Sequence, residues 1–214
     1  MNPTDTSFAE AARALVRVGR FFSDRGSVPA TSGNFSVRLP AERPTGRPAR
    51  RIAITRSGID KGELTEADIL LADIDVPPPP GTSAETPLHF ALYRNLADCG
   101  AIVHTHADAA AILSAALVAE GRLVLTGWEL LKALRGVTTH GARVVLPVFA
   151  NDQDVPALSV RVSAGLATEP GAVAYLLAGH GLYTWGVNLV EAQRHAVALE
   201  HLLTCELERR KIKA

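Results

Sequence analysis

The sequence predicts a three-layer α/β/α fold with a mixed, largely antiparallel central sheet. Segments with apolar residues at helical spacing alternate along the chain with short extended segments. An early pair of extended segments, joined by a polar loop, indicates a β-hairpin, whose strands are antiparallel. With 214 residues, 47% of them apolar, the chain has the size of one domain. We therefore expect residues 1–214 to form a single domain.

The first half supplies the hairpin. An amphipathic helix is predicted over residues 7–23, because apolar side chains recur there every three or four positions. Residues 34–39 and 51–55 are the predicted hairpin strands, and residues 40–50 are its polar tip. A Thr-capped turn over residues 64–68 leads to a strand at 69–73. Four consecutive prolines exclude residues 76–81 from a sheet.

The second half alternates between helices and strands. A helix is expected to follow Ser83 and to end near residue 96, with Pro87 in its first turn. The apolar run 100–103 predicts a buried strand. Further helices are predicted over residues 107–119, 129–134, 156–166 and 188–211. Further strands are predicted over residues 143–148, 172–177 and 182–185.

Charge and cysteine content exclude several classes of partner. The 22 basic and 22 acidic residues cancel, so nothing favours nucleic acid or an anionic membrane. Cys99 and Cys205 are far apart and fit no zinc or redox motif, which indicates free thiols and a cytoplasmic location. No signal segment or bilayer-length apolar run is seen. We expect a soluble protein.

Three histidines have surroundings suited to a metal ion. His104 and His106 follow a predicted strand, and residues i and i+2 of a strand point the same way. His180 lies between two glycines at the end of another predicted strand, where no neighbouring side chain crowds it. Three protein ligands with one open position are typical of catalytic zinc. The alternative is that these histidines are ordinary interior hydrogen-bonding residues.

Three short clusters could hold a phosphate group. Thr31-Ser32-Gly33-Asn34, Thr55-Arg56-Ser57-Gly58 and Thr82-Ser83 each stand where a strand or helix meets a loop. Backbone N–H groups, hydroxyls and amides at such places bind phosphate oxygens. Taken singly, each cluster is equally typical of a turn or a helix cap.

Two carboxylates are candidates for proton transfer. Glu85 follows Ser83 at a helix start, although the helix dipole alone favours an acid there. Glu129 has apolar sequence neighbours, which would raise its pKa, and a surface ion pair with Lys132 is the competing interpretation. The other histidines are expected to be packing or surface residues: His89, His140, His195 and His201.

The chain resembles the class II aldolase/adducin family over nearly its whole length. The resemblance rests on TSGNFS at 31–36, ITRSG at 54–58, SAE at 83–85, HTH at 104–106 and GHG at 179–181. Within the family, residues 129–134, 147–154 and 180–186 resemble the branch that dehydrates a sugar phosphate of methionine salvage. One departure is visible: Gly81-Thr82 stand where many relatives carry Lys-Pro.

The resemblance implies a complete active site. It implies one zinc ion per subunit on His104, His106 and His180, although the sequence alone does not distinguish zinc from iron or manganese. It implies a homotetramer with sites near subunit boundaries. Phosphate contacts are expected from these residues: Asn34, Ser57, Gly58 and Ser83.

The implied reaction is dehydration of 5-methylthioribulose 1-phosphate to the 2,3-diketone. Glu129 is the expected acid and base, and Glu85 the second candidate. The alternatives are an aldolase or epimerase acting on another sugar phosphate, and a non-catalytic adducin-like module.

Overall fold

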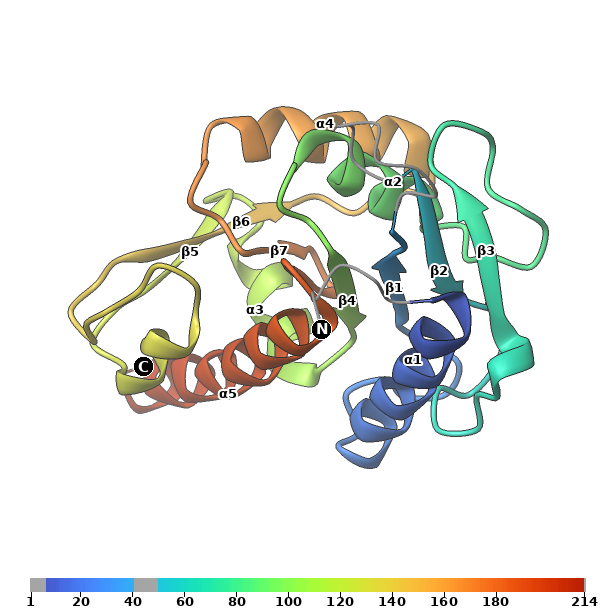
Figure 1. Cartoon of the computed structure of the whole chain (residues 1–214). Coiled ribbons are helices and arrows are strands. Elements are labelled where there is room, and N and C mark those ends of the chain that lie inside the picture. Colours follow the sequence, from blue (N-terminus) through green and yellow to red (C-terminus); the bar gives the residue numbers. More distant parts are fainter. Residues whose placement is uncertain (1–6, 41–49, 214) are drawn as a thin grey trace.

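The protein is built on one eight-stranded sheet of order β3-β2-β1-β4-β8-β7-β6-β5 (Figure 1). The computed structural model describes residues 7–40 and 50–213. Neighbouring strands are antiparallel except β6 and β7, which are parallel. The strands are β1 (Asn34–Arg38), β2 (Arg51–Thr55), β3 (Ile69–Asp73), β4 (Ala101–Thr105), β5 (Arg122–Leu125), β6 (Val144–Phe149), β7 (Ala174–Leu177) and β8 (Gly181–Gly186). The predicted mixed, largely antiparallel sheet is confirmed.

Helices cover both faces of the sheet, which confirms the three layers. α2 and α4 lie together on one face, and α1, α3 and α5 lie on the other (Figure 1). The helices are α1 (Phe8–Asp24), α2 (Thr86–Asn95), α3 (Asp108–Leu117), α4 (Val155–Ala167) and α5 (Leu189–Lys213), with short 3₁₀ turns η1 (Glu66–Asp68) and η2 (Glu129–Ala133). Within residues 7–40 and 50–213, no helix combines the length and apolar character needed to cross a bilayer.

Local sequence sets the start of the first helix. The Ser7 hydroxyl accepts a hydrogen bond from the Glu10 N–H, at 3.3 Å, and the Glu10 carboxylate accepts one from the Ser7 N–H, at 2.8 Å. This reciprocal pair satisfies two N–H groups that the helix leaves free. From there the helix turns Ala11, Leu15 and Phe22 onto the sheet, where all three are fully buried.

Two features differ from the sequence prediction. β5 was not predicted, because it is a four-residue edge strand in which only Leu123 and Leu125 are buried. Residues 129–134 were predicted as a helix and form the 3₁₀ turn η2 instead. The predicted hairpin exists, since β1 pairs with β2, and residues 41–49 of its tip lie outside the described residues.

Candidate metal centre

The ends of the central strands bring together residues that are far apart in the sequence. Asn34 at the start of β1 pairs in register with His104 near the end of β4. Thr105 of β4 pairs with Leu182 of β8, and Leu177 at the end of β7 pairs with Gly181. These strand ends therefore lie side by side at one end of the sheet, and this end carries the predicted histidines.

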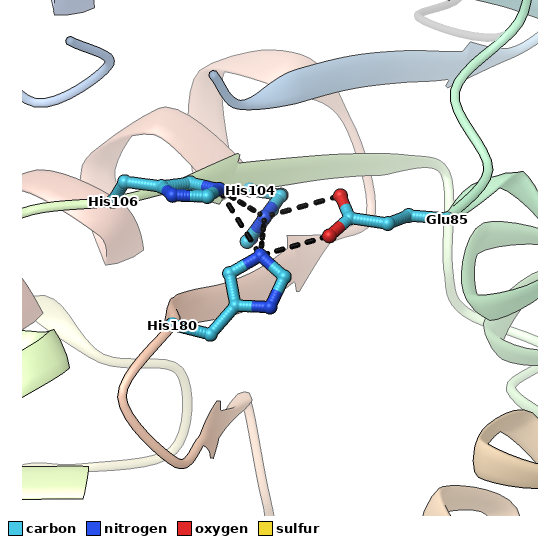
Figure 2. A group of neighbouring side chains, drawn as sticks. All are labelled: Glu85, His104, His106 and His180. Carbon is cyan, nitrogen blue, oxygen red and sulfur yellow. Dashed lines mark hydrogen bonds and ion pairs between the residues drawn. The ribbon is translucent and has the colours of Figure 1, made fainter. Parts of the chain in front are cut away.

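Four side chains converge there: Glu85, His104, His106 and His180 (Figure 2). The Nε2 atoms of the three histidines lie 2.9, 3.1 and 3.2 Å apart. A Glu85 carboxylate oxygen lies 2.8 Å from Nε2 of His180, and the other lies 3.3 Å from Nε2 of His104. The structure thus brings the three predicted metal ligands and one predicted carboxylate into one cluster.

The hydrogen bonds of the Nδ1 atoms show which nitrogen of each histidine ring is available to a cation. Nδ1 of His104 lies 3.0 Å from the Leu182 carbonyl oxygen, and Nδ1 of His180 lies 3.5 Å from Oδ1 of Asn151. Because these oxygens accept hydrogen bonds, each Nδ1 carries a proton, which leaves Nε2 as the nitrogen of each ring that can bind a metal ion. Without a metal ion or a proton between them, Nε2 lone pairs would face one another across about 3 Å.

The donor set fits a divalent metal ion. Tetrahedral zinc with bonds of about 2.0–2.1 Å separates its ligand nitrogens by roughly 3.3 Å, close to the spacing of these Nε2 atoms. Burial, and the charge of His104 and His180, lower the pKa of His106 to about 3. A neutral imidazole is the form that binds metals.

Packing fixes the ring of His104. It stacks on Tyr183, with 3.8 Å between ring centroids and 13° between planes, and Tyr183 stacks in turn on Tyr175 at 4.8 Å. All three residues are fully buried. The ring plane of the central ligand is therefore set by the core and not by solvent-exposed loops.

The glycines beside His180 shape the turn that carries it. A Cβ atom on Gly181 would lie 2.1 Å from the Thr105 carbonyl oxygen, so Gly181 allows the turn to approach β4. Gly179 has φ +65°, a backbone conformation that favours glycine. The sequence predicted these glycines to keep His180 uncrowded, whereas the contacts show that they serve the backbone of the turn.

The long helix α5 packs against β4 and helps to position His106. The Ser27 hydroxyl donates to the Glu200 carboxylate at 2.9 Å, and the Ser27 carbonyl oxygen accepts from the N–H of His106 at 2.8 Å. Burial raises the pKa of the Glu200 carboxyl. The loop after α1 thereby ties the second histidine to the long final helix.

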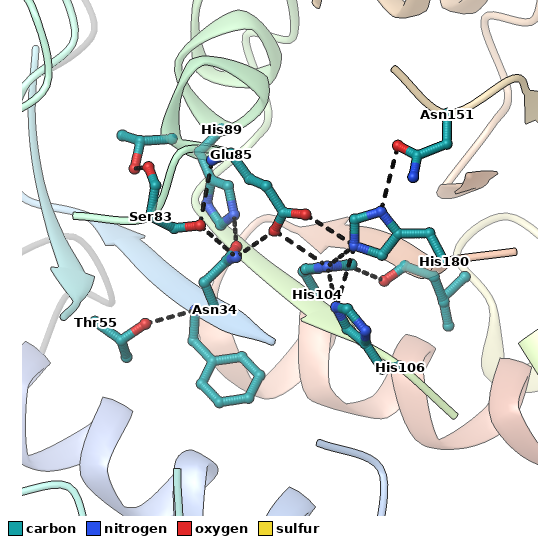
Figure 3. Close-up of polar contacts among 12 residues, drawn as sticks. Asn34, Thr55, Ser83, Glu85, His89, His104, His106, Asn151 and His180 are labelled. Carbon is teal, nitrogen blue, oxygen red and sulfur yellow. Dashed lines mark hydrogen bonds and ion pairs between the residues drawn. The ribbon is translucent and has the colours of Figure 1, made fainter. Parts of the chain in front are cut away.

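A chain of hydrogen bonds runs from Glu85 into the core, and Figure 3 shows its first part, from Glu85 through Asn34 to His89. The Asn34 amide donates to Glu85 at 2.7 Å, and Oδ1 of Asn34 contacts Nε2 of His89. Nδ1 of His89 lies 2.7 Å from the Ser36 hydroxyl, which lies 2.8 Å from the Tyr93 hydroxyl. Since Oδ1 only accepts, His89 donates from Nε2, and Ser36 donates to its Nδ1.

The charges of this network are set by its surroundings. Burial lowers the pKa of His89 to about 3, so its ring is neutral, as the hydrogen bonds require. Burial acts to raise the pKa of the Glu85 carboxyl, but the charge and hydrogen bonds of His104 and His180 outweigh it. They hold that pKa well below its ordinary value. Glu85 is therefore an ionised carboxylate beside the histidines.

The cluster opens into a cavity of about 300 Å³. Its lining includes these predicted site residues: Asn34, Ser57, Ser83, Glu85, His106 and His180. His104 is fully buried behind them. Gly58 follows Ser57 with φ +77°, but it is not among the lining residues that the structure describes. Arg56, which precedes Ser57, also lines the cavity and brings a positive charge to it.

Glu129 lies elsewhere. Its side chain is 70% exposed and forms an ion pair with Lys132, while Nδ1 of His140 is 3.9 Å away. The hydrogen bond from Lys132 lowers the pKa of Glu129, so the expected rise is wrong for the single chain. The apolar sequence neighbours do not surround it, because η2 turns its side chain outward. Glu129 is not among the described residues that line the cavity.

Two residues of the site were not predicted from the sequence. His89 was expected to be packing material, although it lies one helical turn after Glu85 and so on the same side of α2. Lys61 is buried, and its ammonium donates to the carbonyl oxygens of Thr31, at 2.9 Å, and Ile59, at 2.8 Å. It joins the first predicted phosphate cluster to Ile59, the residue that follows the second cluster. No pattern in the sequence marks it.

Known proteins resemble the whole chain. Residues 13–207 match the family model described as Class II Aldolase and Adducin N-terminal domain. Methylthioribulose-1-phosphate dehydratase of Bradyrhizobium sp. is 49% identical over 205 residues, covering 94% of this chain and 91% of that protein. The protein of the same name from Methylococcus capsulatus is 44% identical over 214 residues, covering 98% of each chain.

Solved structures share the fold. The crystal structure of L-fuculose-1-phosphate aldolase from Thermus thermophilus superimposes with a TM-score of 0.76 and 29% identity. The match covers 97% of this chain and 98% of that chain.

Proposed function

The chain belongs to the class II aldolase and adducin family, and from this premise we propose that it dehydrates 5-methylthioribulose 1-phosphate. The product is 2,3-diketo-5-methylthiopentyl 1-phosphate, a step of methionine salvage. The observation that carries the proposal is the convergence of three histidine nitrogens on a cavity in a chain 49% identical to such a dehydratase. The enzyme would be a hydro-lyase.

We propose one zinc ion per subunit, held by His104, His106 and His180. Bound zinc supplies a Lewis acid that polarises the C2 ketone and makes the C3 proton acidic. The chain's own contribution is to hold the rings in place: the Leu182 carbonyl and Asn151 fix the tautomers of His104 and His180, and Tyr183 fixes the plane of His104.

The reaction needs a base at C3 and an acid at C4. A carboxylate takes the C3 proton, and a proton is returned to the C4 hydroxyl, which leaves as water. The resulting enol tautomerises to the 2,3-diketone, so no carbon–carbon bond breaks. We propose Glu129 for this role and keep Glu85 as the second candidate.

Their positions give the two glutamates different requirements. Glu85 already lies against the histidine cluster, as a carboxylate. Glu129 is exposed outside the cavity of its own chain, so it has to reach the cavity of a neighbouring subunit. This requirement is met by the proposed homotetramer with sites near subunit boundaries.

The phosphate end of the substrate does no chemistry. We propose that Asn34, Ser57, Gly58 and Ser83 hold it at the end of the cavity formed by β1 and β2. Phosphate binding there fixes C3 and C4 relative to the acid and base, which supplies several kcal/mol of positioning. Because Asn34 also donates to Glu85, the proposed phosphate site lies beside the Glu85 carboxylate.

Location and organisation are proposed with the same function. Cys99 and Cys205 are both free thiols, which supports a reducing compartment and the cytoplasm. We propose that residues 1–214 make one domain, since all described strands belong to one sheet.

A second candidate function is aldol cleavage of a sugar phosphate. It is favoured by Glu85, which lies at the cluster, and by the likeness to L-fuculose-1-phosphate aldolase at 29% identity. The non-catalytic alternative is opposed by the intact ligand set of His104, His106 and His180.

One incubation separates these candidates. Metal-loaded protein is mixed with 5-methylthioribulose 1-phosphate, and the products are followed by mass spectrometry. We expect the diketone, 18 mass units lighter than the substrate. Dihydroxyacetone phosphate would instead establish cleavage, and unchanged substrate together with no bound metal would establish a non-catalytic module. Glu129→Gln and Glu85→Gln then assign the base, which is the glutamate whose loss abolishes diketone formation while zinc is retained.

A further inference from the structure

We infer that the cavity recognises an apolar substituent on C5 of its substrate, through a wall formed by Val155 and Leu158 of α4, Leu177 of β7 and Leu88 of α2. The inference rests on the proposed function for the orientation of the substrate. It adds the part of the site that distinguishes one sugar phosphate from another.

The strand order gives the cavity two ends. The proposed phosphate residues follow β2 or begin β1, the histidines belong to β4 and the turn before β8, and Leu177 ends β7. In the order β2-β1-β4-β8-β7-β6, the metal centre therefore lies between the phosphate end and the β7 end. Figure 3 shows the same spatial order, with Ser83 and Asn34 on one side of the histidines and Asn151 on the other.

The β7 end is apolar because it is a corner of the core. Leu88, Leu158 and Leu177 belong to the apolar cluster that α2 and α4 form with the sheet, and Val155 packs against it. All four also line the cavity. Val155 is half-buried and supplies most of the exposed surface of this wall, and the three leucines, which are almost fully buried, back it and hold it in place.

Polar side chains near this wall are already committed to other partners. The Asn151 side-chain oxygen accepts from the N–H of Asp152 at 3.0 Å and faces His180. The Asp152 carboxylate pairs with Arg161 at 2.7 Å and accepts from the N–H of Asp154 at 3.0 Å. The carboxylate and amide groups of Asn151 and Asp152 are therefore turned to the chain itself, and the four apolar side chains share this part of the cavity lining with Gln153.

The substrate's two ends match the two ends of the cavity. With the C1 phosphate at β1 and β2 and the C2 and C3 oxygens at the histidines, C4 and C5 extend toward β7. β4 and β7 are two strand spacings apart, or about 10 Å, which leaves room for the C5 substituent and a leucine side chain. A methylthio group on C5 would be buried there, whereas a hydroxyl would lose its water.

The expected discrimination is modest. One or two apolar heavy atoms in a pocket of this kind change binding by roughly tenfold. We therefore expect 5-methylthioribitol 1-phosphate to bind about ten times more tightly than ribitol 1-phosphate, with 5-deoxyribitol 1-phosphate between them. These alditols lack the ketone and cannot be dehydrated, so their dissociation constants are measured without turnover.

The test compares two leucines on one helix. Leu158 and Leu166 are both buried in the same cluster, two turns apart on α4, but only Leu158 lines the cavity. Isothermal titration of metal-loaded Leu158→Ala with the three alditol phosphates should show the methylthio preference reduced at least threefold. Leu166→Ala should keep the wild-type preference. If either alanine variant fails to fold, Val155→Thr and Val162→Thr make the same comparison with smaller changes.

Two results would overturn the inference: no methylthio preference in the wild-type protein, or an equal loss of preference in the cavity and control variants. The proposed function is judged separately, by diketone formation. A protein that prefers the methylthio compound but forms no diketone keeps the recognition wall and loses the dehydratase assignment.

Discussion

Replacing His89 with leucine should weaken both the fold and the metal centre. His89 contacts no predicted metal ligand through its hydrogen bonds, but it holds Asn34 on one side and Ser36 on the other. Asn34 in turn donates to Glu85, which lies against His104 and His180. Leucine fills most of the same space and removes both hydrogen bonds.

The size of the effect follows from these contacts. The variant leaves the buried Asn34 side-chain oxygen without its His89 partner, at about 1–3 kcal/mol, whereas the Ser36 hydroxyl keeps its contact with the Tyr93 hydroxyl. The free energy of unfolding should therefore fall by roughly 1–3 kcal/mol. Zinc affinity should fall about tenfold, the lower end of the range for residues that contact a ligand directly, because His89 acts on the cluster only through Asn34 and Glu85.

His195 provides a matched control. It is equally buried, and its ring also makes two hydrogen bonds, to the Trp185 carbonyl oxygen at 2.8 Å and from the Arg135 N–H at 3.1 Å. His195→Leu should cost comparable stability while its zinc affinity stays within threefold of the wild type. Urea unfolding of the metal-free proteins gives the first quantity, and competition with a chromophoric chelator gives the second.

The reasoning is refuted if both variants lose zinc affinity equally, since that would make the loss a general consequence of destabilisation. It is also refuted if His89→Leu binds zinc like the wild type, because the path through Asn34 to Glu85 would then have no influence on the metal.

Three further predictions follow from single residues. Burial lowers the pKa of His195 below its unfolded value, so the stability this ring contributes is present above pH 6.5 and lost as the pH falls. The urea midpoint of the metal-free protein should drop between pH 7 and 5.5, and less so in His195→Leu. Gly181→Ala should lower the melting temperature and abolish tight zinc binding, because its Cβ would overlap the Thr105 carbonyl oxygen; a soluble variant with wild-type zinc affinity contradicts this. Lys61→Met should cost about 1–3 kcal/mol in urea unfolding, since two backbone carbonyl oxygens lose a charged donor; an unchanged midpoint would show that their pairing is dispensable.

The parts of the metal cluster were predictable because their geometry is local, and their convergence was implied by the resemblance to the family. His104 and His106 share a direction through the period of a strand, and the small residues around His180 are a local requirement of its turn. The layer order and most element boundaries follow from the same periodicities. The sequence also indicated that Glu85, at the start of α2, could act at the cluster, and the structure places it there.

The predictions that failed, for Glu129 and His89, depended on the folded surroundings of these residues and not on their neighbours in sequence. The apolar neighbours of Glu129 in sequence suggested burial, yet η2 turns this side chain to solvent beside Lys132. His89 gave no signal of its own, because its partners Asn34 and Ser36 come from a strand more than fifty residues earlier. Such pairings exist only after the sheet has formed.

The same long-range pairing determines when the ion can influence folding. The strand ends that bear the histidines are neighbours only through the register of β1, β4 and β8, which joins the first, middle and last thirds of the chain. Contacts of this span close late, since their loop entropy is lost before they stabilise anything. A bound cation should therefore prolong the lifetime of the native protein by slowing unfolding, and leave the refolding rate almost unchanged.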